Sequence, residues 1–164
     1  MKKARQSFKG CLVMGMAVLL LGVGVLYLAH QANQAPVLAV PPEVVKRTQR
    51  LVLQGRGVMV DFYLPAAVAE APVVIVAHGF SRSRRVMAGW GILLARHGMC
   101  AVVPDLPFFA DHEGNAQAVR ELVSRAHEGG LGEQPVLKGG IGLLGHSAGG
   151  FGTLLAAVGD AEGS

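Results

Sequence analysis

The order of apolar and polar positions from residue 49 onward predicts strands that alternate with helices. Residues 49–53 and 58–64 alternate in polarity on either side of Gly55-Arg56-Gly57, which is typical of an antiparallel hairpin at a sheet edge. Three later apolar runs show no alternation, which favours strands buried on both faces of a parallel sheet. These runs are residues 72–77, 99–103 and 141–144.

Three segments with helical spacing lie between and after these runs. They are residues 85–97, with Val86, Trp90, Leu93 and Leu94 on the inward face, residues 115–127, with Ala118, Leu122 and Val123 inward, and the small-residue segment 148–158. This order of elements implies right-handed crossovers. The expected fold class is therefore α/β, a doubly wound, mostly parallel sheet with helices on both faces. Ligands of such sheets bind at the carboxyl ends of the strands, here residues 77–80, 105–111 and 145–149.

The chain opens with a different pattern, a basic leader followed by the uncharged apolar segment 11–29. This segment is longer than the roughly 7–15 residues of a signal-peptide core and fits the roughly 17–25 residues of a spanning helix. A retained signal anchor and a cleaved signal peptide both fit residues 1–29, and either leaves the leader in the cytoplasm and exports the rest. The folded domain is then membrane-anchored outside the cytoplasm, or secreted or periplasmic after cleavage. Residues 30–46 are polar and proline-rich, which predicts a tether before a folded domain at 47–164.

Charge and cysteine content narrow the possible classes of function. The formal net charge is +4, but the excess lies in the leader, and the remaining basic side chains equal the 11 acidic ones in number. A nucleic-acid-binding surface is therefore not expected. Cys11 and Cys100 lie in two separate apolar segments, so no disulfide is expected. No metal-ligand spacing occurs in the sequence, and neither a metal nor a cofactor is expected.

A glycine-flanked serine follows the third buried run. Gly145-His146-Ser147-Ala148-Gly149 matches G-x-S-x-G between a strand and a helix, the context of a nucleophile elbow. On so sharp a turn the residues two positions from the nucleophile must lack side chains, and Gly145 and Gly149 meet this need. Ser147 would also lie at a helix N-terminus, whose N–H groups favour developing negative charge. A glycine-rich turn with a serine N-cap is the structural alternative.

A second motif follows the first buried run at the equivalent strand end. His78-Gly79-Phe80 stands where hydrolases with this elbow place the other half of their oxyanion hole. The expected oxyanion donors are the backbone N–H groups of Phe80 and Ala148. His78 is expected to order its loop through hydrogen bonding, and His146 to support the elbow.

Together the two motifs resemble the α/β-hydrolase superfamily, with the chlorophyllase-like, cutinase-like and platelet-activating-factor acetylhydrolase-like serine esterases as the most similar groups. The resemblance covers about residues 47–158. It implies hydrolysis of small or lipid-like carboxylic esters through an acyl-enzyme on Ser147, without a cofactor. A non-catalytic, membrane-tethered binding domain (a pseudoenzyme) and an acyltransferase with the same elbow remain alternatives.

The rest of a catalytic triad is not found where the resemblance places it. The superfamily order is serine, then acid, then histidine. The residues after Ser147 include Asp160 and Glu162 but no histidine, so the resemblance implies that this chain carries an incomplete site. Asp160 follows the elbow too closely to be the family's acid and is expected on the surface. His112, beside Asp111, is the earlier histidine that could approach the elbow from a strand-end loop.

Other conspicuous features have structural interpretations. Residues 140–145 fit G-x-G-x-x-G, but their glycines precede and occupy a predicted strand, which disfavours dinucleotide binding. Arg82, Arg84 and Arg85 are expected to form a solvated rim beside the oxyanion loop. Asp105 is expected to be a turn residue.

Overall fold

The computed structural model describes residue 30, residues 38–132 and residues 136–161. The chain divides into two compact units, Met1–Ala35 and Pro36–Ser164, and the sheet with its helices belongs to the second. The segment predicted to be a signal anchor or signal peptide, residues 11–29, lies outside the described residues, and so does Cys11. Within the described part of the chain, no helix combines the length and the apolar character that crossing a membrane requires.

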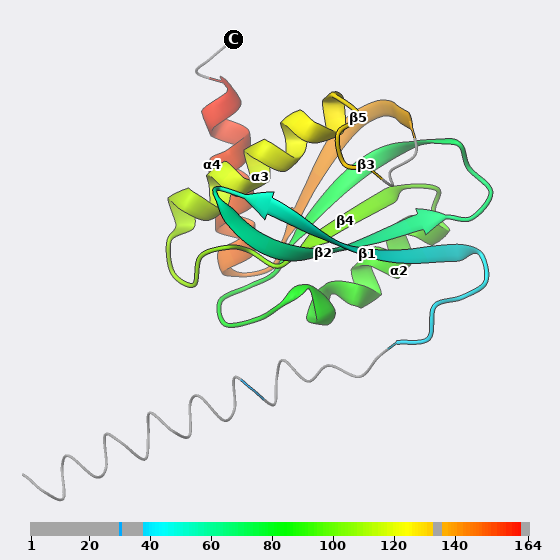
Figure 1. The fold of residues 1–164 in the computed structure, drawn as a ribbon, viewed down its shortest axis with the longest axis horizontal. Coiled ribbons are helices and arrows are strands. Elements are labelled where there is room, and N and C mark those ends of the chain that lie inside the picture. Colours follow the sequence, from blue (N-terminus) through cyan, green and yellow to red (C-terminus); the bar gives the residue numbers. More distant parts are fainter. Residues whose placement is uncertain (1–29, 31–37, 133–135, 162–164) are drawn as a thin grey trace, which may run out of the picture. The chain divides into compact units, whose positions relative to one another are not determined.

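Five strands form one mixed sheet (Figure 1). They are β1 (Val44–Leu53), β2 (Arg56–Pro65), β3 (Glu70–Ala77), β4 (Cys100–Pro104) and β5 (Val136–Gly145). Their order across the sheet is β1-β2-β4-β3-β5. β3 is parallel to both β4 and β5, whereas β2 is antiparallel to both β1 and β4. The α/β class is confirmed, but the sheet is mixed and not mostly parallel, because the pairings β1–β2 and β2–β4 on the hairpin side are antiparallel.

The hairpin is longer than its alternating pattern indicated. β1 begins at Val44, ahead of the expected domain start near residue 47, so Lys46 belongs to the sheet and not to the tether. Leu53 pairs with Arg56, and the turn is therefore Gln54-Gly55 and not residues 55–57. Gln54 has a φ of 48° and Gly55 a φ of 72°. Two successive positive φ values suit the twist of hairpin strands, and this geometry shortens the turn to two residues.

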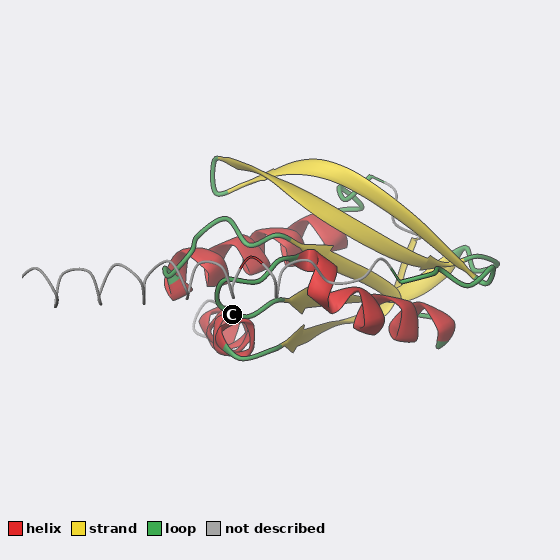
Figure 2. Ribbon diagram, turned by 90° about the horizontal axis from the view of Figure 1, so that it is seen from below, coloured by secondary structure: helices red, strands yellow, loops and turns green. Residues whose placement is uncertain are grey.

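Helices cover both faces of the sheet, which twists across its width (Figure 2). The 3₁₀ turn η1 (Arg84–Met87) and α2 (Ala88–Arg96) pack on one face, while α3 (His112–His127) and α4 (Ala148–Ala161) pack on the other. The core on the α2 side includes Val44, Tyr63, Val76, Met87, Ala95, Ala101 and Val103. The core on the α3 side includes Phe62, Val73, Ile75, Val102, Ala118, Leu122 and Ala156.

The inward face of α2 differs from the face that hydrophobicity predicted. Trp90 is 48% exposed and Leu93 is 45% exposed, so the prediction that both point inward is wrong. The helix instead buries Ala88, Gly91 and Ala95. A Cβ on Gly91 would lie 2.3 Å from a ring carbon of Tyr63, so the helix backbone touches the sheet side chain directly. Close approach of backbone to sheet selects small residues for the buried face and leaves the large ones outside.

Gly91→Ala is expected to destabilise the protein despite alanine's better helix propensity. Tyr63 is 1% exposed and cannot retreat into solvent, so the added methyl overpacks the core at a cost of about 1–3 kcal/mol. The gain in propensity offsets at most about 1 kcal/mol of this cost. Gly89→Ala is the matched control, because its Cβ would meet only Leu38 at 3.8 Å. Urea unfolding of both variants measures the difference, and equal midpoints would contradict the close packing of α2.

Candidate active site

The sheet brings the two sequence motifs to one place. β3 and β5 are parallel neighbours, and Ala77 pairs with Gly145, so the residues that follow each strand emerge side by side. The His146 N–H donates to the Ala77 carbonyl over 3.1 Å. A Cβ on Gly79 would lie 3.3 Å from Cβ of Ser147, which shows how closely the two loops approach.

Ser147 lies on a strained turn between β5 and α4. Its φ is +54°, a left-handed conformation that costs a non-glycine residue about 1–2 kcal/mol. A Cβ on Gly145 would meet the Gly149 carbonyl oxygen at 2.4 Å, and a Cβ on Gly149 would meet that of His78 at 2.4 Å. The steric need inferred from the motif is therefore present in the fold. The Ser147 side chain is exposed, and its carbonyl accepts the N–H of Phe151 at the start of α4.

His78 has one definite tautomer, because its hydrogen bonds fix the proton. Nε2 accepts the backbone N–H of Leu106 over 2.9 Å, so the ring proton is on Nδ1, which donates to the Gly79 carbonyl over 2.9 Å. The Gly79 carbonyl and the Phe80 N–H belong to the same planar peptide unit. His78 therefore sets the direction of the N–H expected to bind an oxyanion.

Burial lowers the pKa of His78, outweighing the hydrogen bond to Gly79 and the charge of Asp105. The side chain is 8% exposed, and its neutral form is the one that can accept from Leu106.

Because the His78 pKa is lower in the folded protein, the unfolded chain binds its proton first as pH falls. The free energy of unfolding is therefore expected to decrease as pH falls below about 6.5, the ordinary value for histidine, until the folded-state pKa is passed. His78→Gln should lower stability at pH 7 and flatten this dependence. Urea unfolding at a series of pH values between 5 and 8 measures the free energy of unfolding. If this free energy depended on pH equally in the unmutated protein and in His78→Gln, the depressed pKa would be contradicted.

A small pocket opens beside the two motifs. Its lining consists of His78, Gly79, Phe80, Leu106, Phe108, Asn115, Ala148 and Gly149. Both residues expected to supply oxyanion donors thus border the same space. The ring of Phe80 lies 4.5 Å from that of Phe109, and the two side chains are 51% and 71% exposed. The lining thus combines apolar side chains with Ala148, the residue that follows Ser147.

Sequence reasoning missed Asn115, which lies in the first turns of α3. Its side chain is 7% exposed and holds the backbone of Phe108 twice. Oδ1 accepts the Phe108 N–H over 3.1 Å, and Nδ2 donates to the Phe108 carbonyl over 2.9 Å. A polar residue at an inward position of an otherwise apolar helix face was the available signal, because buried amides are usually hydrogen-bonded.

Sequence reasoning also misassigned Arg84. Its side chain is only 15% exposed and forms ion pairs with Asp61 and Asp105, so it is not a solvated rim residue. Asp105 was expected to be a turn residue, but its carboxylate also binds the guanidinium and the backbone N–H of Arg84. Arg82 and Arg85 are exposed, as expected. The cluster of basic residues along one loop could not reveal Asp61 as the partner, because Asp61 comes from a distant strand.

The earlier histidine, His112, makes a packing contact beside the elbow. Its ring meets the Phe151 ring edge-on, with centroids 5.4 Å apart. Asp111 is the N-cap of α3, and its carboxylate accepts the Gly114 N–H over 2.9 Å. Residues 140–145, the competing glycine pattern, lie within β5.

Comparison with solved structures identifies the architecture. Brefeldin A esterase, described as a bacterial homologue of human hormone-sensitive lipase, superposes with a TM-score of 0.65 and 21% identity over 90% of this chain and 45% of its own. The fold is that of the α/β-hydrolases. A bacterial heroin esterase gives a TM-score of 0.61 and 19% identity, over 85% of this chain and 47% of its own.

A third α/β-hydrolase structure shows the same relationship. Dienelactone hydrolase from Anabaena variabilis superposes with a TM-score of 0.56 and 19% identity, over 73% of this chain and 60% of its own. The chain thus spans about half the length of these α/β-hydrolases. Neither a family model nor a curated relative matches it by sequence.

Proposed function

We propose that the complete protein is a serine hydrolase that cleaves carboxylic esters through an acyl-enzyme on Ser147. The observation that carries the proposal is the strained serine at φ +54°, between glycines that admit no side chain and against the Gly79 loop. The structures that share the fold include esterases and a dienelactone hydrolase, which supports ester chemistry.

The proposed reaction begins when Ser147 Oγ attacks the ester carbonyl carbon. The serine proton passes to a general base, and the carbonyl oxygen becomes an oxyanion bound by the N–H groups of Phe80 and Ala148. Collapse of the intermediate breaks the bond to the alkoxide, which takes the proton from the base and leaves as the alcohol. Water then attacks the acyl-enzyme by the same route and releases the acid. The resemblance assigns the triad acid and base to positions after Ser147, and residues 148–164 contain no histidine that could be this base.

Placement outside the cytoplasm is also a proposal. It rests on the basic leader and the uncharged segment 11–29. A substrate reached from that side would be a small or lipid-like ester.

Fluorophosphonate labelling of the complete protein, including its general base, tests the proposed nucleophile. The probe forms a stable bond only with an activated serine, and digestion with mass spectrometry locates it. We expect the label on Ser147 and its loss when p-nitrophenyl butyrate competes. Absence of labelling would favour the non-catalytic alternative. Release of acyl groups mainly to an added alcohol would favour the acyltransferase.

A further inference from the structure

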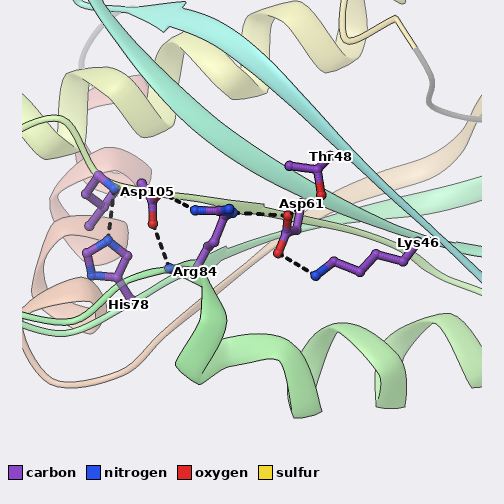
Figure 3. Close-up of polar contacts among 7 residues, drawn as sticks. Lys46, Thr48, Asp61, His78, Arg84 and Asp105 are labelled. Atoms are coloured by element: carbon purple, nitrogen blue, oxygen red, sulfur yellow. Dashed lines mark hydrogen bonds and ion pairs between the residues drawn. The ribbon is translucent and has the colours of Figure 1, made fainter. Parts of the chain in front are cut away.

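A chain of charged side chains runs from the hairpin to the loop after β4 (Figure 3). Asp61 is 1% exposed and forms an ion pair with Lys46, whose Nζ lies 2.9 Å from Oδ2. Its Oδ1 accepts hydrogen bonds from Thr48 Oγ1 at 2.7 Å and from Arg84 Nε at 3.0 Å. Arg84 then reaches Asp105, with its Nη1 2.6 Å from Oδ2 and its own backbone N–H 2.8 Å from Oδ1. Burial alone would raise the pKa of Asp61, but these hydrogen bonds hold it below its usual value, so the carboxylate stays charged.

The same loop holds the other end of the oxyanion segment. Asp105 binds Arg84, and the next residue, Leu106, donates its N–H to His78 Nε2. Segment 78–84 is therefore fixed at both ends to two consecutive residues. Asp105 is itself anchored, because its N–H donates to the Met59 carbonyl over 2.8 Å.

The interior of segment 78–84 needs such restraint. Ser81 has a φ of +51°, a left-handed conformation that a serine adopts at a cost. The Arg82 N–H donates to the Gly79 carbonyl over 3.2 Å, the same carbonyl that accepts from His78. Strained turns persist only where the surroundings determine them.

We propose that Arg84 is a positioning residue for the oxyanion donor of Phe80. The Arg84–Asp105 pair fixes the loop that presents the Leu106 N–H, Leu106 fixes the His78 ring, and His78 fixes the peptide unit that carries the Phe80 N–H. Asp61 binds Nε of the same guanidinium, and this second contact restricts the rotation of the group and keeps Nη1 directed at Asp105. This inference rests on the proposed function, because it assigns Arg84 to the same site.

Arginine suits this position for a geometric reason. Its guanidinium is planar and presents donors in fixed directions, so Nε can bind Asp61 while Nη1 binds Asp105. A lysine could keep the charge but has no rigid fork to join two carboxylates in set directions.

The test compares Arg84→Gln, Arg84→Lys and Asp105→Asn in the complete protein with the control Lys46→Met. Lys46 binds the other oxygen of Asp61, so its loss weakens the same cluster but leaves the Arg84–Asp105 contact in place. The readouts are kcat and KM for Ser147-dependent hydrolysis of p-nitrophenyl butyrate, and the tautomer of His78 from ¹⁵N NMR of its ring.

We expect Arg84→Gln and Asp105→Asn to lower kcat by about 10- to 100-fold with little change in KM, less than loss of a whole oxyanion donor. Arg84→Lys should recover part of kcat. In the glutamine and asparagine variants His78 should show two tautomers in place of one. Lys46→Met should keep both kcat and the single tautomer, although its free energy of unfolding falls.

Two results would overturn the positioning role. The first is an unchanged kcat and His78 spectrum in Arg84→Gln. The second is an equal loss of kcat in Lys46→Met, which would mean that activity follows stability alone. If Arg84→Gln does not fold, Asp105→Asn and Arg84→Lys decide by the same criteria. Absence of Ser147-dependent hydrolysis in the unmutated complete protein would refute the proposed function, and the His78 spectra would still decide the role of Arg84.

Discussion

In the complete protein, Ser147→Ala is expected to abolish ester hydrolysis and fluorophosphonate labelling while leaving the fold intact. Without Oγ no acyl-enzyme can form, and kcat should fall by at least about 10³-fold and up to about 10⁶-fold, leaving only rate enhancement from binding and the oxyanion donors. Stability should change little, because alanine adopts the +54° φ of Ser147 at the same cost as serine. Kinetics with p-nitrophenyl butyrate and urea unfolding measure the two quantities.

Ser147→Gly separates the strain from the chemistry. Glycine adopts a positive φ freely, so this variant should be equally inactive yet more stable than the unmutated protein by about 1–2 kcal/mol. Ser124→Ala, at an exposed position of α3, is the control for loss of a hydroxyl. Labelling that persists in Ser147→Ala would refute the nucleophile assignment. A destabilised Ser147→Gly would show that the turn is not strained.

The elbow could be predicted from the sequence because its rules are local. The clash at Gly145 arises within the turn, because its Cβ would meet backbone atoms of Gly149 and Gly150, and the buried apolar runs before the turn identify the strands. The second motif follows from the same logic, since parallel neighbours end at the same edge of the sheet. The clash at Gly149 is different, because its Cβ would meet the His78 and Ala77 carbonyls at the end of β3, and the spacing of the motif marks this glycine without revealing that contact.

The charged cluster could not be predicted, because its members come from separate segments. Lys46 lies where the sequence suggested a tether, Asp61 lies on β2, and Arg84 follows the oxyanion loop. Nothing in the spacing of these residues indicates that they meet. The buried face of α2 was missed for a related reason: hydrophobicity identifies large apolar residues, whereas a helix that touches the sheet selects small ones such as Gly91.

Gly149→Ala is expected to cause the largest loss of stability of any single methyl addition discussed for this protein. The new Cβ would lie 2.4 Å from the His78 carbonyl oxygen and 2.5 Å from that of Ala77. Both are backbone atoms at the end of β3 and cannot rotate away, so α4 must move off the sheet. We expect a loss of more than about 4 kcal/mol in the free energy of unfolding, or failure to fold.

Gly152→Ala is the matched control, because it lies in the same helix and its Cβ would meet nothing within 4 Å. It should gain about 0.5–1 kcal/mol from helix propensity. Urea unfolding, or soluble yield where a variant does not fold, compares the two. If Gly149→Ala unfolded with the midpoint of the unmutated protein, α4 would have to lie farther from β3 than the structure places it. Ser147 could not then lie against Gly79, and the proposed oxyanion hole would lose its geometric basis.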